Sequence, residues 1–254
     1  MKEKTVLINC SPKKKMSVSG FLMKCVKLLI RGERVCLPLR VPADRERILR
    51  ELKEADRVIF VMPLYVDGVP SHVLPFLKEA ERFCRESSLR LKVYVLANNG
   101  FIEGRQNEPL MQVMENFCSR SGLVWSGGVG IGGGVMLNVM RILIPVQTAL
   151  TVLSGAAGLT RGEGIGELLT SIGLIALETA FLCSGVAAYL LRLARHIGRG
   201  TDAGKRYTRI MLPSFLFILI ADLFFAVISL FRGGLFRGWL CRFKPDEKGD
   251  IIQG

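Results

Sequence analysis

The sequence predicts an α/β fold with a doubly wound, five-stranded parallel sheet, and two patterns support this prediction. Short apolar runs without polar alternation recur through the first half of the chain, and segments with apolar residues at helical spacing separate them. Strands that are buried on both faces lack alternation, and right-handed crossovers then place helices on both faces of the sheet. The apolar sequence after about residue 135 predicts, in addition, a helical insertion and a C-terminal hydrophobic helix.

Strands and helices are expected to alternate from the start of the chain. The expected strands span residues 5–10, 34–39, 57–62, 91–98 and 123–131, and the helices between them span residues 20–30, 43–55, 71–87 and 108–122. The helix at 43–55 shows the basis of these assignments, because its apolar residues Ile48, Leu49, Leu52 and Ala55 form one stripe among charged residues.

The second half of the chain is expected to add apolar helices to this domain. Residues 138–175 are apolar, are interrupted by Pro145 and Gly155, and predict the helical insertion. Residues 176–198 are placed to form the helix that closes the sheet after the fifth strand. The first domain is therefore expected to span residues 1–200.

The remaining segment, residues 201–254, is expected to associate with a membrane or to mediate oligomerisation. Residues 210–231 carry one charge, Asp222, and are long enough for a helix that crosses a bilayer. Basic residues lie on both sides, so they set no orientation: Lys205, Arg206 and Arg209 before it, and Arg232, Arg237, Arg242 and Lys244 after it. A spanning helix, an interfacial helix and a helix packed against a second copy in a homodimer all remain open.

Composition indicates an anionic membrane surface as a partner. Half of the residues are hydrophobic, the aromatic fraction is 8%, and the formal net charge is +13. The arginines at 192–209 are interpreted as a basic patch next to the membrane. Nucleic acid is excluded as a partner, because the basic residues lack interleaved aromatics and a recognisable reading motif.

Cysteine usage predicts free thiols in a reducing compartment. Seven cysteines are scattered without a CxxC pair or a histidine at ligand spacing, so no metal site is expected. The apolar run near the N-terminus is too short for a signal peptide. We therefore expect the protein at the cytoplasmic face of the membrane, or otherwise in the cytoplasm.

An anion site is predicted where the first strand meets the first helix. The stretch "NCSPKKKMSVSG", residues 9–20, joins hydroxyls and three lysines to a helix start. The first turn of a helix presents unpaired N–H groups and the positive end of the helix dipole. A solvated lysine run is the alternative reading.

Two further loops should meet this stretch, because ligands of open parallel sheets bind at the carboxyl ends of the strands. These loops are "PLYVDGVPS", residues 63–71, and "NNGFIEGRQN", residues 98–107. One supplies an aromatic side chain, and both supply short polar residues and exposed backbone. Together the three loops predict a pocket for a flat ring with a phosphate tail. Asp67 has turn formation as an alternative role.

Three blocks of the sequence resemble the flavodoxin-like NAD(P)H-dependent FMN reductase family, including its iron–sulfur flavoprotein relatives. The blocks are "INCSPKKKMSVSGFL", "PLYVDGVPSHVLPFLKEAE" and "NNGFIEGRQNEPLMQVMENFCSRSGLVWSGGVGIGGGVML". The resemblance covers about residues 4–136, with a weaker echo at 176–200. It implies the strand order 2-1-3-4-5, FMN as cofactor and NAD(P)H as electron donor.

The resemblance also implies the residues that hold FMN, and it assigns no catalytic side chain. Ser11, Lys13, Ser17, Val18 and Ser19 would hold the phosphate. Pro63, Leu64, Tyr65, Val66 and Asp67 would border the ring on one side, and Asn98, Asn99, Gly100 and Phe101 on the other.

The sequence departs from the family in three respects. The family's phosphate loop is richer in Gly, Asn and Thr, whereas this loop has Met16 and three lysines. The cysteines of the iron–sulfur branch are absent, so no cluster is expected, and the apolar second half has no counterpart in the common soluble members.

Three other residue patterns are assigned no cofactor or catalytic role. The GxGxxG at Gly128, Gly130 and Gly133 follows the fifth strand, so a rim of the pocket or a close backbone approach is preferred to a dinucleotide fingerprint. His72 and His196 are interpreted as structural or solvated.

Three functions follow from these observations. The first is a membrane-associated FMN oxidoreductase that reduces a quinone-like or other small acceptor. The second is a flavodoxin-like electron carrier or redox sensor without turnover, since no nicotinamide site is identifiable in the sequence. The third is a membrane-tethered scaffold that has lost FMN, which the unusual lysine loop would suit.

Overall fold

The structure is a computed structural model that describes residues 3–160 and 165–231. The chain divides into two compact units, Met1–Leu212 and Pro213–Gly254. The first unit contains the sheet and its helices, and it extends beyond residue 200 because a strand near residue 207 lies in the sheet. The second unit contains α7, Ser214–Phe231, which begins directly after Pro213. Cys241 and the basic residues from Arg232 onward lie outside the described residues.

The sheet has six strands in the order β2-β1-β3-β4-β5-β6, and all paired strands are parallel. The five predicted strands form β1 to β5 in the order 2-1-3-4-5. Their bounds are β1 Lys4–Asn9, β2 Glu33–Pro38, β3 Arg57–Pro63, β4 Lys92–Asn98 and β5 Val124–Gly132. Strands β1, β3 and β4 are almost entirely buried, as their unbroken apolar runs predicted.

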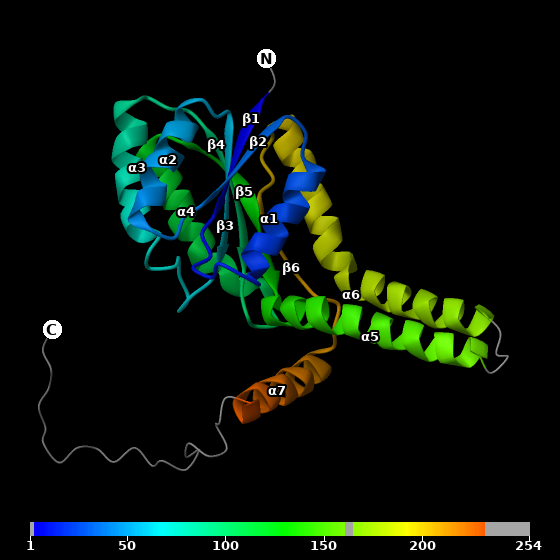
Figure 1. Ribbon diagram of the computed structural model, residues 1–254. Coiled ribbons are helices and arrows are strands. Elements are labelled where there is room, and N and C mark those ends of the chain that lie inside the picture. Colours follow the sequence, from blue (N-terminus) through cyan, green and yellow to red (C-terminus); the bar gives the residue numbers. More distant parts are fainter. Residues whose placement is uncertain (1–2, 161–164, 232–254) are drawn as a thin grey trace, which may run out of the picture. The chain divides into compact units, whose positions relative to one another are not determined.

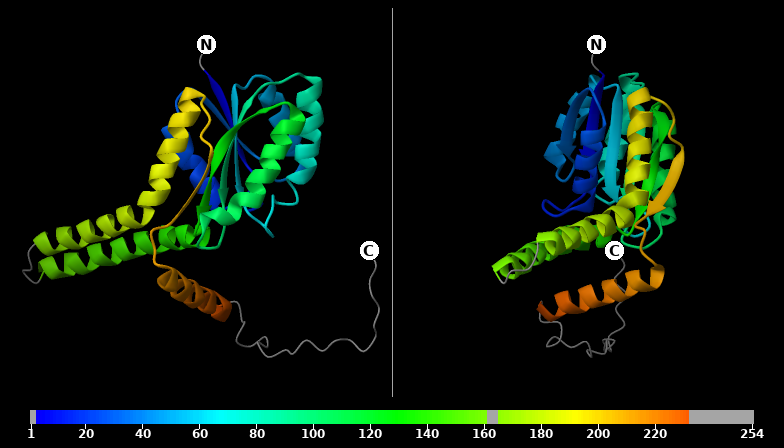
Figure 2. Two further views of the ribbon diagram at one scale, coloured as in Figure 1. Left: turned by 180° about the vertical axis from the view of Figure 1, so that it is seen from behind. Right: turned by 90° about the vertical axis from the view of Figure 1, so that its right-hand side faces the viewer.

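Helices cover both faces of the sheet (Figure 1). Helices α2 (Pro42–Lys53), α3 (Leu74–Glu86) and α4 (Glu108–Ser121) lie on one face, and they share a hydrophobic core with it. Helix α1 (Val18–Leu29) and the C-terminal half of α6 (Ile165–Arg199) lie on the other face, as the view from behind shows (Figure 2). A short 3₁₀ helix, η1 (Gly104–Asn107), precedes α4.

The prediction of a five-stranded sheet was wrong, because β6 (Lys205–Arg209) adds a sixth strand beside β5. Its sequence, KRYTR, is short, charged and only partly buried. Edge strands often carry lysine and arginine, which prevent pairing with other chains. The sequence analysis therefore interpreted these residues as part of a basic patch, whereas they complete the sheet. Helix α6 is the crossover between β5 and β6.

Polar contacts fix β6 to the start of α4. The Tyr207 hydroxyl donates a hydrogen bond to the carboxylate of Glu108. Lys205 lies 3.3 Å from Glu108 and 2.6 Å from Glu115. The Tyr207 hydrogen bond is the main cause that holds the pKa of Glu108 below its ordinary value, and Gln112 and Lys205 add to it.

These contacts predict an acid-sensitive anchor for β6. A carboxyl group with a lowered folded-state pKa stabilises the fold above its ordinary pKa of 4.5, and this contribution is lost as the pH falls through the folded-state pKa. We expect E108Q to lose less thermal stability than the parent chain between neutral pH and pH values below 4.5. The Y207F variant keeps the ion pair and should lie between the two. Identical pH profiles for all three would contradict this role.

Strand β5 is rich in glycine because other backbone segments approach it closely. An ideal Cβ on Gly127, which has φ +87°, would lie 2.5 Å from the backbone nitrogen of Gly204. On Gly130 it would lie 2.8 Å from the Tyr207 ring, and on Gly132 it would meet the backbone of Ile102. The glycine run therefore makes room for η1 and β6, which agrees with the close backbone approach proposed from the sequence.

Helices α5 (Gly134–Thr160) and α6 form an antiparallel pair that extends beyond the sheet (Figures 1 and 2). They contain the predicted helical insertion. The C-terminal half of α6 buries Val186, Leu190, Leu193 and Ile197 against the sheet unit. The Tyr94 hydroxyl fixes the end of α6 by donating to the carbonyl of Thr201 at 3.0 Å.

Neither histidine shows more than a structural contact. His72 Nε2 lies 3.1 Å from the carbonyl of Leu39. His196 Nδ1 lies 2.9 Å from the Thr201 hydroxyl, at the end of α6. Both contacts join neighbouring elements of the fold.

Candidate functional site

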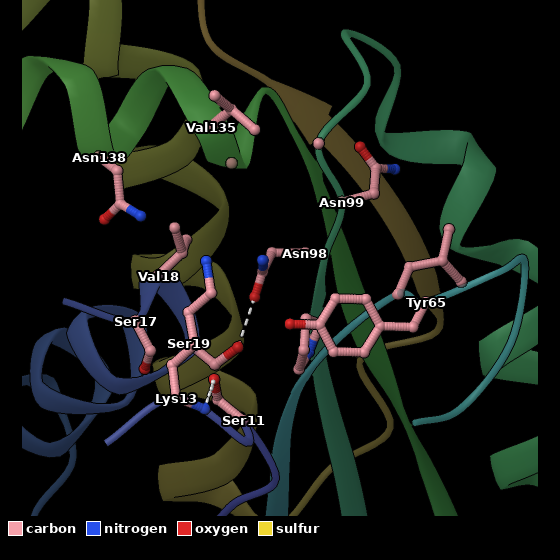
Figure 3. Close-up of a pocket in the computed structure, with 14 residues that line it drawn as sticks. Ser11, Lys13, Ser17, Val18, Ser19, Tyr65, Asn98, Asn99, Val135 and Asn138 are labelled. Atoms are coloured by element: carbon pink, nitrogen blue, oxygen red, sulfur yellow. Dashed lines mark hydrogen bonds between the residues drawn. The ribbon is translucent and has the colours of Figure 1, made fainter. Parts of the chain in front are cut away.

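The candidate site is a cavity at the carboxyl ends of β1, β3 and β4, which include the point where the strand order reverses (Figure 3). Its volume is about 160 Å³, and it is open to solvent. The lining residues come from three predicted loops and from the first turn of α5: Ser11, Lys13, Ser17, Val18, Ser19, Pro63, Leu64, Tyr65, Asn98, Asn99, Gly100, Gly134, Val135 and Asn138. The sheet topology thus brings together eleven of the fourteen predicted site residues.

The loop after β1 is held by its own side chains. Asn9 Oδ1 accepts a hydrogen bond from the Ser11 backbone N–H at 3.1 Å, and Ser11 Oγ accepts one from the Lys13 N–H at 3.4 Å. Met16 has a positive φ of 53°. Asn9 and Ser11 are buried, so the loop enters the cavity with a defined backbone.

Ser17 caps helix α1 at this loop. Its Oγ accepts a hydrogen bond from the Gly20 N–H at 2.9 Å. The N–H groups of Val18 and Ser19 lie in the first turn, where an α-helix offers no internal acceptor. Lys13 lines the same end of the cavity. Helix dipole, backbone donors and a lysine charge therefore converge on one position that suits an anion.

Cys10, beside this loop, is no candidate nucleophile. Its side chain is fully buried, and burial raises the pKa of its thiol. A thiol with a raised pKa stays protonated at neutral pH, and the protonated form is a poor nucleophile.

The wall formed by β4 carries an unsatisfied acceptor. The Ser19 hydroxyl donates to Asn98 Oδ1 at 2.8 Å, across the floor of the cavity. Asn99 Nδ2 donates to the carbonyl of Glu103 at 2.9 Å, but Asn99 Oδ1 is buried without a partner. Buried polar atoms are nearly always paired, so this oxygen suits a ligand that brings an N–H or O–H donor.

The loop after β3 presents Tyr65 to the cavity from the side opposite Ser17 (Figure 3). Tyr65 and Gly68 pair through two backbone hydrogen bonds of 3.1 and 3.0 Å. Val66 and Asp67 occupy the turn between them with φ values of 45° and 54°. Two consecutive positive φ values are typical of a type I′ hairpin turn.

Three predicted residues do not line the cavity. Val66 and Asp67 are exposed at the tip of the turn, so Asp67 takes the turn role that the sequence left open. Phe101 is 57% exposed and points no lining surface into the cavity. For the eleven residues that do line it, the role in binding FMN remains a prediction.

Helix α5 adds residues to the site that the sequence analysis missed. Asn138 Nδ2 donates to the Met16 carbonyl at 3.2 Å. Arg141 donates to Asn138 Oδ1 at 3.1 Å, and its guanidinium lies 4.7 Å from the centre of the Phe21 ring. The two are polar residues three positions apart in an apolar stretch, and this spacing places them on one helix face. That isolated polar pair was the signal available in the sequence.

Sequence comparisons give no match. No family model matches the chain, and neither does any curated protein.

Solved structures with a similar fold include three that illustrate the range. The Trp repressor binding protein from Bacillus subtilis is 20% identical, with a TM-score of 0.41, over 51% of this chain and 84% of that one. For the NAD(P)H:quinone oxidoreductase from Methanothermobacter marburgensis the values are 15%, 0.43, 56% and 92%. For a flavoenzyme NAD(P)H:(acceptor) oxidoreductase from Paracoccus denitrificans they are 17%, 0.41, 48% and 74%.

The strand order decides the fold class. Order 2-1-3-4-5, with the cavity where the order reverses between β1 and β3, is the flavodoxin arrangement. The chain has a flavodoxin-like fold. The sixth strand and the extended α5–α6 pair are additions to it.

Proposed function

We propose that the protein is an FMN-dependent oxidoreductase that accepts electrons from NAD(P)H and reduces a quinone-like or other small acceptor. We further propose that it works at the cytoplasmic face of a membrane. The observation that carries the redox proposal is the combination of an anion position at α1 with a ring-sized opening between Tyr65 and Asn99 in one cavity.

The residues of the cavity fit FMN. The phosphate suits the first turn of α1, where backbone donors, the Ser11 hydroxyl and Lys13 converge. The isoalloxazine ring carries polar edges and an apolar face, which suit Asn99 Oδ1 and the Tyr65 ring respectively. At about 160 Å³ the cavity is smaller than the ~300 Å³ at which small-molecule pockets begin. Part of the bound ring would therefore remain open to reactants.

When bound, FMN supplies the transfer of hydride from NAD(P)H and the onward transfer of electrons. The side chains of the protein bind the cofactor, orient it and set the polarity around its ring. No acid–base pair is required of them. The activities in the names of the Methanothermobacter and Paracoccus proteins agree with this proposal, which is based on the cavity.

A flavin titration followed by anaerobic reduction tests the proposal. Purified full-length protein in mild detergent should take up FMN, quench its fluorescence and turn yellow. Added NADH or NADPH should then bleach the visible band within seconds. Flavin uptake without bleaching would favour an electron carrier or redox sensor. A folded protein that takes up no flavin would overturn the proposal and favour a membrane-tethered scaffold.

A further inference from the structure

We propose that helices α5 and α6 form a membrane-spanning hairpin, and that this hairpin holds the cavity at the surface of the bilayer. The name hairpin arm is used here for residues 142–158 of α5 and 165–181 of α6. The location deepens the proposed function, but the argument for the arm is independent of any flavin.

The base of the arm is defined on both helices. On α5, Arg141 contacts Asn138 and the Ser17 carbonyl, so the helix is still part of the cavity wall at this residue. On α6, the Leu182 carbonyl accepts a hydrogen bond from the Met211 N–H at 3.0 Å. Beyond these residues the two helices pack on each other, and Gly155 lies against Leu168 with no room for a Cβ.

The arm exposes apolar side chains on several sides. Outside the α5–α6 seam, large hydrophobic residues are between about two-fifths and two-thirds exposed: Ile142, Leu143, Val146, Leu150, Val152 and Leu153 on α5, and Ile165, Leu169, Leu174, Leu177 and Phe181 on α6. A water-exposed helix carries charged residues on its outer face. Residues 142–158 carry no charge at all. Lipid surrounds such an arm completely, whereas a groove on a protein covers one side of it.

Hydroxyl groups within the arm are satisfied by their own helices. Thr148 donates to the Ile144 carbonyl at 2.8 Å, and Ser154 donates to the Thr151 carbonyl at 3.0 Å. On α6, Thr170 donates to the Gly166 carbonyl and Thr179 to the Ile175 carbonyl, each at 2.8 Å. In hydrocarbon no water pairs with such groups, so bonds of this kind are the arrangement that a bilayer requires.

The length of the arm suits a bilayer. Each helix of the arm has 17 residues, which corresponds to about 25 Å at 1.5 Å per residue. This is the lower end of the range for spanning helices, about 17–25 residues. Both helices also pass a test of length and hydropathy for membrane spans, as α5 does over Gly134–Gly158.

Charges at the two ends of the arm differ in sign. Near the base lie Arg141, Arg209 and the exposed lysines Lys13, Lys14 and Lys15. The sequence between and after the two arm helices adds Arg161, Glu163 and Glu167. By the positive-inside rule, the sheet unit lies in the cytoplasm and the tip crosses to the other side.

Glu178 is the one carboxyl within the arm that lies away from its tip. It is four residues from Leu182, which is about 6 Å along the helix. A position so close to the base lies at the headgroup layer, where a charged group is far less costly than at the bilayer centre.

The arm brings the cavity close to lipid. Asn138 lines the cavity, and the first residue of the arm, Ile142, follows four positions later on the same helix. If the proposed redox function holds, its acceptor is therefore a molecule dissolved in the membrane rather than in the cytoplasm.

Two charge variants of the full chain, expressed in bacterial cells, test which helices hold it in the membrane. The parent chain should resist extraction from membranes by alkaline carbonate. The L150E/L174E variant places charges on exposed positions in the middle of the arm and should be at least tenfold more extractable. The matched L219E/L223E variant changes exposed leucines of α7 in the same way and should remain in the membrane fraction.

The extraction has two outcomes against the proposal. An arm variant that stays in the membrane would overturn it, as would an arm variant that is released from a soluble dimer of the parent chain. The flavin spectrum of the released variant, read separately, reports on the proposed function alone.

Thiol labelling tests the crossing without dependence on the solubility of a variant. We expect a membrane-impermeant maleimide to label the E167C variant, at the tip, in intact spheroplasts. The matched R90C variant, on the exposed surface of the sheet unit, should be labelled only after permeabilisation. The signal of the parent chain, with its native cysteines, is subtracted from both. Labelling of E167C only after permeabilisation would show that the arm does not cross the bilayer.

Discussion

We expect the S17D variant to bind FMN at least about 100-fold more weakly than the parent chain. Ser17 is the N-cap of α1, at the position that suits the phosphate. Aspartate is as good an N-cap as serine, so the helix should keep its start. Two unit charges about 4 Å apart near a protein surface repel by roughly 4 kcal/mol. This exceeds the about 2.8 kcal/mol that corresponds to a hundredfold loss of affinity.

The matched control for this change is S17N. Asparagine also caps helices and has nearly the shape of aspartate, but it carries no charge. Fluorescence titration with FMN should give S17N an affinity within about tenfold of the parent, since one neutral hydrogen bond contributes about 0.5–1.5 kcal/mol. Riboflavin, which lacks the phosphate, should bind S17D and S17N alike. Equal FMN affinities for both variants would show that the phosphate lies elsewhere.

The largest effect on stability is expected for G127A, in the strand that adjoins β6. Its Cβ would lie 2.5 Å from the nitrogen and 2.6 Å from the oxygen of Gly204, and backbone cannot move aside as a side chain can. Overpacking costs about 1–3 kcal/mol, and a left-handed conformation adds about 1–2 kcal/mol. We expect a loss of about 2–4 kcal/mol, which lowers Tm by about 5–15 °C in a unit of this size.

Gly122 supplies the control for backbone conformation. It ends α4 with φ +74°, and a Cβ there would meet nothing within 4 Å. The G122A variant should therefore lose only the conformational part, about 1–2 kcal/mol. Thermal unfolding of both variants, followed by circular dichroism in the same detergent, gives the comparison. Equal Tm values for the two would show that contact with Gly204 contributes nothing.

The central sheet was predictable because its strands are buried on both faces. Unbroken apolar runs such as Arg57–Pro63 have few other interpretations, and the helices between them fix the parallel arrangement. The strand Lys205–Arg209 was not predictable in the same way, because an edge strand is half solvated and its pairing depends on the glycines of β5. Its residues resemble a solvated charged segment.

The site was predictable to the extent that it lies at strand ends. The residues after β1, β3 and β4 meet in one cavity because parallel strands bring their carboxyl ends to one edge. Val66 and Asp67 fall outside because the loop folds into a hairpin turn, which spacing alone did not show. Asn138 and Arg141 were missed because their helix was interpreted only as an apolar insertion, and its contact with Met16 depends on tertiary structure.

The position of β6 in the chain has a consequence for synthesis. A ribosome that has released residues 4–132 has produced five strands whose glycine-rich last member still lacks its neighbour. That open edge persists until about seventy further residues have emerged, and uncovered edges invite pairing with other nascent chains. Translation that stops between the fifth and sixth strands should therefore produce fragments prone to aggregation and dependent on chaperones.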